Sequence, residues 1–169
     1  FQSSFMLEML RRILDVRAEG PQSPVAPQII REFHYRLGTA SEKAAEDSNS
    51  LIYAVASHYY AAGATHGAQG MSTCMTAARA ASDQFQHETA RRFLEMAVEC
   101  AESAGMRDRD FERERLLLEC RAAHVEGKGR VEIAQRCLDY LQEYSDASFR
   151  VYQAAAQACY DAALDTRDQ

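Results

Sequence analysis

The stretch from Ile52 to Ala97 reads IYAVASHYYAAGATHGAQGMSTCMTAARAASDQFQHETARRFLEMA. Apolar and small residues recur in it at spacings of three and four, which is the period of an amphipathic helix. Glycines and polar residues fall between the periodic segments, where helices begin and end. The stretch therefore predicts three consecutive helices joined by short turns.

The same pattern extends over the rest of the chain and predicts an all-α fold of about eight helices. The expected helices cover residues 4–19, 27–38, 52–62, 66–82, 86–104, 108–126, 130–144 and a last one from Ala147. Thr39 and Glu42 have the spacing of a capping box, so the third helix begins either there or near Ser48. Short turns between helices force neighbours to pack antiparallel.

Within this pattern one ladder of spacings recurs four times, at starts 22, 44 and 34 residues apart. A small residue where two helices cross lets their backbones approach, and larger residues one turn away fill the remaining space. The ladder predicts the core, and its four copies are Ile52, Val55, Ala56, Tyr59, Ala68 and Met75; Cys74, Ala77, Ala78, Ala81, Ala90, Leu94 and Ala97; Leu118, Ala122, Val125, Ala134, Leu138 and Leu141; and Tyr152, Ala155, Ala156 and Cys159.

This ladder resembles tetratricopeptide repeats, over roughly Leu51 to Leu141. More narrowly, residues 56–63, read with Ala77-Ala78 and residues 90–97, resemble helical regions behind the ATPase modules of large bacterial signalling proteins. Those proteins include maltose-activator-type transcription regulators and multidomain kinases. The resemblance implies an antiparallel helix-hairpin array, an α-solenoid, whose first helices line a concave groove.

Charge and composition exclude several classes of function. The net charge of −6 and pI near 5.4 argue against a phosphate-backbone partner. No apolar run is long enough to predict a membrane span. Five well-separated cysteines indicate reduced core thiols, and hence a cytoplasmic protein without a disulfide framework. Residues 1–3 resemble an expression-tag remnant, and residues 4–169 are expected to form one array excerpted from a longer protein.

Motifs for catalysis, cofactors or metals are weak in this sequence. The glycine-rich segment 63–70 lacks the lysine of a phosphate loop, so its glycines indicate turns and close packing. Cys120 and His124 stand at i and i+4 on one helix, but a closed metal site needs four ligands. His87-Glu88 has no second histidine at the zinc-protease spacing. The alternating charges of residues 107–115 indicate a solvated helix face. We expect no enzyme activity, cofactor or metal.

The partner-binding residues are expected one position beyond the core ladder, on the helices that would line the groove. Tyrosine there offers contact area with a polar tip, and arginine can pair with a carboxylate. Packing of the tyrosines between helices is an equally open reading. The candidates are Tyr53, Ser57, Tyr60, Arg79, Glu119, Gln153, Gln157 and Tyr160.

These features favour a protein-interaction scaffold within a larger regulatory or signalling protein, binding a peptide or a neighbouring domain. The alternative is a module that senses a small ligand in its alanine-lined interior. Self-association through the terminal helices is a third hypothesis, because the ends of an array expose apolar faces.

Overall fold

The structure, a computed structural model, describes residues 25–45, 51–145 and 147–165, and within these ranges the fold is all-α. The helices are α2 (Val25–Ala45), α3 (Ile52–Ala62), the short 3₁₀-helix η2 (Ala64–His66), α4 (Gly67–Asp83), α5 (His87–Ala104), α6 (Arg109–Glu126), α7 (Arg130–Glu143) and α8 (Phe149–Asp165). The expected first helix, residues 4–19, and the expected tag remnant, residues 1–3, lie outside the described residues. No helix of the described part is both long and apolar enough to cross a bilayer.

The predicted bounds of α4 to α8 agree with the structure to within one or two residues. Local signals explain this agreement. The Asp108 carboxylate accepts a hydrogen bond of 2.8 Å from the Phe111 N–H and caps α6. Gly105 and Gly127 end α5 and α6 in the left-handed conformation, with φ of 64° and 70°.

The predicted end of the second helix at Gly38 is wrong, because α2 continues to Ala45. Thr39 does not cap a new helix; its hydroxyl donates to the Tyr35 carbonyl one turn back, at 3.1 Å. Glu42 accepts a hydrogen bond of 2.7 Å from the Tyr59 hydroxyl. Gly38 allows α2 to approach α3, since an added Cβ would lie 3.3 Å from the Tyr59 ring.

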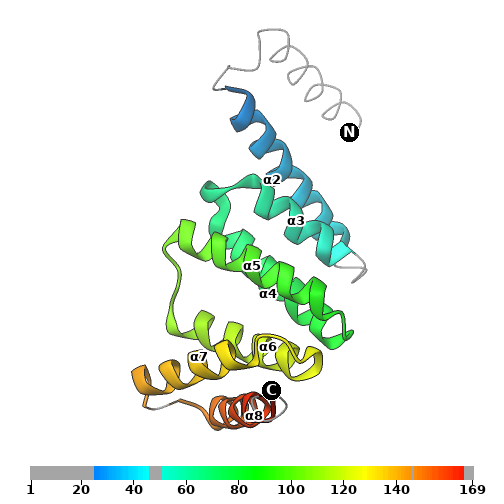
Figure 1. Cartoon of the computed structure of the whole chain (residues 1–169). Coiled ribbons are helices and arrows are strands. Elements are labelled where there is room, and N and C mark those ends of the chain that lie inside the picture. The colour runs from blue at the N-terminus through cyan, green and yellow to red at the C-terminus, as the bar shows by residue number, and fades with distance from the viewer. Residues whose placement is uncertain (1–24, 46–50, 146, 166–169) are drawn as a thin grey trace.

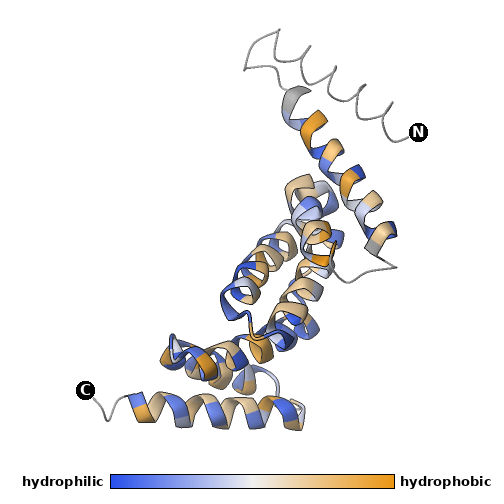
Figure 2. Cartoon of the chain, turned by 90° about the vertical axis from the view of Figure 1, so that its right-hand side faces the viewer, coloured by the Kyte–Doolittle hydropathy of each residue, from blue (hydrophilic) through white to orange (hydrophobic). Residues whose placement is uncertain are grey.

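The helices follow one another through the molecule in chain order (Figure 1). The most extensive contact is between α4 and α5, followed by the contacts of α3 with α2 and with α4. Next, α6 packs with α7, and α8 lies against both. Figure 2 shows α8 lying across the end of this stack. The helix α3 packs against both α2 and α4.

The core consists of two clusters. The first joins α3, α4 and α5 with Phe111 of α6, and the second joins α6, α7 and α8. All seven residues of the second ladder copy are buried, as are Val55, Ala56, Tyr59 and Met75 of the first. The second cluster is built on Leu116, Cys120, Ala134, Cys137, Tyr140, Val151, Ala155 and Ala158.

The register of the ladder is wrong at several positions. Ala68 and Ala156 are exposed, and so are Val125, Leu138 and Tyr152, which keep 55%, 42% and 45% of their surface. In α6 and α7 the predicted Ala122 and Ala134 are buried, but so are Leu116, Cys120 and Cys137, which lie one or two positions before predicted core residues. A shift of this size turns a helix by up to about half a revolution, which moves a side chain from the core to solvent.

The glycine-rich segment serves helix packing, as its ordinary interpretation predicts. Gly67 and Gly70 are buried where α4 crosses α5. A Cβ at Gly67 would lie 3.0 Å from the Cys100 carbonyl oxygen, and a Cβ at Gly70 would lie 2.6 Å from the Cys100 sulfur. The two glycines thus permit the close approach of α4 and α5, which form the most extensive helix contact in the described part of the chain.

Candidate functional site

The predicted stripe on α3 faces α5. The Tyr53 ring stacks on Phe93, with ring centroids 5.5 Å apart, and the Ser57 hydroxyl donates to the Tyr53 carbonyl at 2.8 Å. The Tyr60 hydroxyl donates to Glu99 at 2.5 Å, which raises the pKa of Tyr60 above its ordinary value. For Tyr53 the packing alternative is confirmed, and Tyr60 joins α3 to α5.

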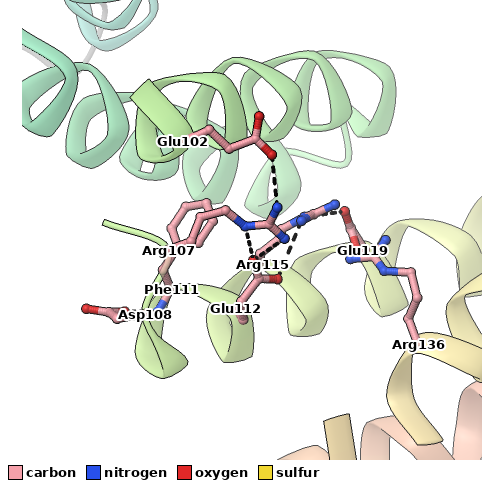
Figure 3. A network of polar contacts seen from close by, with 8 residues as sticks. All are labelled: Glu102, Arg107, Asp108, Phe111, Glu112, Arg115, Glu119 and Arg136. Carbon is pink, nitrogen blue, oxygen red and sulfur yellow. Dashed lines mark hydrogen bonds and ion pairs between the residues drawn. The ribbon is translucent and has the colours of Figure 1, made fainter. Parts of the chain in front are cut away.

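Arg79 and Glu119 lie at different helix contacts. Arg79 of α4 forms an ion pair with Glu114 of α6. Glu119 lies between Arg115 and Arg136, with N–O distances of 3.0 Å and 2.6 Å, and joins α6 to α7 (Figure 3). The structure therefore brings Arg79 next to α6 but does not bring it together with the α3 stripe.

The three predicted residues of α8 divide between two sides of that helix. Gln153 and Gln157 line a cleft between α8 and α6. Tyr160 keeps 60% of its surface exposed and does not line this cleft. Phe149, which is 79% exposed, is a second large apolar residue of α8 on the surface. Self-association through this helix stays a prediction.

The cleft between α6 and α8 has a volume of about 480 Å³. Its residues recur at helical spacing on each helix, so one stripe of α6 faces one stripe of α8. The lining consists of Leu117, Cys120, Arg121 and His124 from α6, and Arg150, Gln153, Ala154, Gln157 and Ala158 from α8. An apolar floor with amide and cationic groups at its edges can hold a polar ligand in a fixed orientation.

The charge of this cleft is positive, although the chain as a whole is acidic. Two arginines contribute to the lining, which contains no carboxylate among the described residues. Arg121 pairs with the exposed Asp83 at 2.7 Å, and its guanidinium lies 6.0 Å from the centre of the Phe85 ring. Arg150 forms no ion pair with the described residues, so its guanidinium is available to a ligand carboxylate.

One side of the cleft is fixed by Asp161, which is 5% exposed. His124 Nδ1 donates to one of its oxygens at 2.7 Å, and Gln157 Nε2 donates to the other at 2.8 Å. Burial alone would raise the pKa of Asp161, but these hydrogen bonds outweigh it and lower the pKa below its ordinary value. Asp161 thereby holds a residue of α6 and a residue of α8 in place beside the cleft.

Asp161 should make the stability of the protein depend on pH. Its folded-state pKa is lowered, so its stabilising effect is present above about pH 4 and is lost as the pH falls through the folded-state pKa. Asp161→Asn should lower the free energy of unfolding by about 1–3 kcal/mol at pH 7, because charged hydrogen bonds are lost. Urea unfolding at about pH 7, 5 and 3 should show that the difference in unfolding free energy between the unaltered protein and Asp161→Asn becomes smallest at the lowest pH.

The matched control for this prediction is Asp165→Asn, one turn further along α8. Asp165 pairs with Arg130 at 2.7 Å and is more exposed than Asp161, so its loss should cost less. If the stability difference between Asp161→Asn and the unaltered protein stayed constant from pH 7 to pH 3, the charge of Asp161 would not contribute to stability.

The wall between the cleft and the core contains two thiols. Cys120, which is 8% exposed, lines the cleft, and its sulfur lies 3.3 Å from the sulfur of the fully buried Cys137 of α7. Among the described residues no group of three or more histidine, cysteine or acidic side chains could hold a metal ion. Cys120 and His124 are instead engaged with Cys137 and Asp161.

A second cleft, of about 440 Å³, opens between α5 and the pair α6–α7, and Glu119 is one of its lining residues. Each arginine that lines it already has an ion pair: Arg91 with Glu126, and both Arg115 and Arg136 with Glu119. The network continues along α6, where Arg107 bridges Glu102 of α5 and Glu112 (Figure 3). Among the described residues this cleft therefore offers a ligand no unpaired arginine, whereas the cleft between α6 and α8 offers Arg150.

The alternating run 107–115 contains the helix ion pairs that its spacing predicts. Arg113 pairs with Asp110 at 2.8 Å, and Arg115 with Glu112 at 3.4 Å. Arg115 is only 17% exposed, however, so this part of the run lies at a helix contact and not on a fully solvated face.

Several residues of the cleft were not predicted from the sequence, chiefly Leu117, Arg121, Arg150 and Asp161. They belong to α6 and α8, in which some buried residues lie one or two positions away from the predicted ones. The hydrogen bond between His124 and Asp161 joins residues 37 positions apart, and nothing in the local sequence marks it.

Comparison with known proteins finds no relative. No protein-family model matches the chain, and neither a curated protein nor a solved structure is similar to it.

Proposed function

We propose that this chain is a tetratricopeptide-like array of helix pairs that binds a protein segment, and that an acidic segment of the partner enters the cleft between α6 and α8. The observation that carries the proposal is the lining of this cleft, in which Arg150, Arg121 and two glutamines surround an apolar floor. The sequential packing of α2–α3, α4–α5 and α6–α7 supports the array.

The chemistry of the cleft favours an extended peptide with an acidic side chain. Arg150 would pair with the carboxylate of the peptide, because it has no ion pair within the described residues. Gln153 and Gln157 stand one turn apart, and a glutamine side chain both donates to carbonyl groups and accepts from N–H groups. Leu117 and the two alanines of α8 would contact the apolar part of the side chain.

The position of the cleft agrees with such a role. It lies between α6 and α8, which would be the first helices of successive pairs in such an array, and the concave surface of helix-pair arrays is formed by first helices. The helices α4 and α6 are also neighbours, and they are joined by the ion pairs Arg79–Glu114 and Asp83–Arg121. A cytoplasmic location within a larger regulatory or signalling protein is part of this proposal and rests on the resemblance of residues 51–141.

The binding proposal predicts that Arg150→Glu weakens binding of an acidic peptide about tenfold or more, because attraction is replaced by repulsion. The probe is a short fluorescein-labelled peptide rich in glutamate and leucine, and its affinity is measured by fluorescence anisotropy. The same peptide with glutamine in place of glutamate should bind weakly to the unaltered protein.

The matched control is Arg92→Glu, which makes the same charge change at an exposed position of α5 outside the cleft. It should leave the affinity within about twofold, because solvent and salt screen a distant charge. If both variants lost the same affinity for the peptide, binding would depend on long-range electrostatic attraction only. This result would refute the cleft as the binding site.

A small-ligand sensor is the second candidate, and the volume of the cleft supports it. About 480 Å³ falls within the range of roughly 300–1,000 Å³ that small-molecule sites occupy. Thermal-shift measurement with a set of small carboxylates distinguishes the two functions. A stabilising carboxylate whose effect is lost in Arg150→Glu, without peptide binding, would favour the sensor.

A further inference from the structure

Cys120 and Cys137 are placed for a reaction with each other. Their sulfur atoms, one from α6 and one from α7, lie 3.3 Å apart. A disulfide bond is about 2.05 Å long, so the sulfurs would need to approach by roughly 1.3 Å. Both side chains lie within the same core cluster, and a change of side-chain rotamer within it can supply a movement of this size.

Access to the two thiols is unequal. Cys120 is one of the residues that line the cleft between α6 and α8, whereas Cys137 is fully buried and does not line it. A small molecule that enters the cleft therefore meets Cys120 first. The hydrogen bond to Cys137, together with burial, raises the pKa of the Cys120 thiol, so little thiolate is present at neutral pH and the reaction is slow.

We propose that Cys120 and Cys137 form an oxidisable dithiol site, which a hydroperoxide entering the cleft between α6 and α8 converts into a disulfide. The Cys120 thiolate attacks one peroxide oxygen and breaks the O–O bond, which gives a sulfenic acid and hydroxide. The Cys137 sulfur then attacks the Cys120 sulfur. Its proton and the displaced hydroxide leave as water, so two thiols and one hydrogen peroxide yield one disulfide and two waters.

The chain provides its own control in Cys74 and Cys100. These thiols, on the neighbouring helices α4 and α5, are also buried, at 0% and 6% exposure, and the Cys74 thiol donates to the Ala56 carbonyl oxygen at 3.8 Å. Neither lines the cleft between α6 and α8. If access through the cleft decides reactivity, the pair Cys120–Cys137 should oxidise first while Cys74 and Cys100 stay reduced.

The test is a time course of the folded protein with hydrogen peroxide, followed by alkylation of free thiols, trypsin digestion and mass spectrometry. Arginines at 121 and 136 place Cys120 and Cys137 in separate tryptic peptides, so the disulfide appears as a cross-linked pair. We expect this pair to form before any Cys74–Cys100 cross-link, and dithiothreitol to reverse it.

Two variants separate the steps. In Cys137→Ser, dimedone should label Cys120 as a persistent sulfenic acid. In Cys120→Ser, Cys137 should stay alkylatable after peroxide treatment. Oxidation of both pairs at the same rate, or a Cys120 that stays fully reduced under excess peroxide, would overturn the proposal. The time course of the unaltered protein tests the oxidation proposal even if a variant fails to fold. The test does not depend on peptide binding.

Discussion

Replacing Phe93 with alanine should lower the free energy of unfolding by about 3–5 kcal/mol, the range for large buried aromatics. Phe93 of α5 is 4% exposed and lies in the first core cluster. Its ring stacks on Tyr53, so the substitution leaves a cavity beside a second aromatic ring. Urea unfolding followed by circular dichroism measures the loss.

Phe85→Ala is the matched control, because it deletes the same side chain from the surface. Phe85 is 71% exposed, and its backbone is left-handed with φ of 59°. The change should stay within about 0.5 kcal/mol, as for ordinary surface substitutions. Equal losses for Phe93→Ala and Phe85→Ala would contradict the packing of α3 on α5.

Gly67→Leu should be the next most damaging substitution, with a cost of about 1–3 kcal/mol or more from overpacking. An added Cβ at Gly67 meets the Ser103 hydroxyl at 2.9 Å, the Ala104 Cβ at 3.0 Å and the Cys100 carbonyl oxygen at 3.0 Å. The carbonyl belongs to the backbone of α5 and cannot rotate away. The helices α4 and α5 must therefore separate, and a lower thermal midpoint should report this.

Ala68→Leu tests the neighbouring position on the same helix turn. Ala68 is exposed, so a larger side chain there meets solvent, and stability should change by no more than about 0.5 kcal/mol. If both leucine variants were equally stable, the close crossing of α4 and α5 would be wrong.

The helix boundaries could be predicted from the sequence where a local signal is decisive. Gly105, Gly127 and Asp108 end or begin helices through their own backbone geometry and hydrogen bonds, and these depend on few neighbours. Gly38 shows the limit of this reasoning. It was interpreted as a helix end, but the glycine serves contact with Tyr59 of another helix, which no local pattern reveals.

The core register could be predicted in α4 and α5 but only in part in α6 to α8, where the predicted Ala122, Ala134 and Ala155 are buried but other predicted residues are exposed. Alanines mark the crossing face of α4 because larger residues would not fit there. In α6 the consecutive leucines 116, 117 and 118 give no single face, and the packing of α7 and α8 decides which leucine is buried. Only Leu116 is fully buried.

The candidate site illustrates the same limit. Gln153 and Gln157 were predicted to face a partner and do line a cleft, whereas Tyr53 and Tyr60 engage α5. Arg150 and Asp161 gain their roles only when α8 lies against α6, and this contact depends on the whole second core cluster. The predicted groove was derived from each helix separately. It therefore included residues that lie at different helix–helix contacts in the structure.

The most direct test of the binding account is an NMR titration of the isotope-labelled protein with the unlabelled acidic peptide. The largest amide shift changes should fall on Arg121, His124, Arg150, Gln153 and Gln157, which line one cleft. Tyr60 and Glu99, which lie at the contact of α3 with α5, should shift little. Changes centred on Tyr60 and Glu99, with Arg150 and Gln153 unmoved at saturation, would contradict the account.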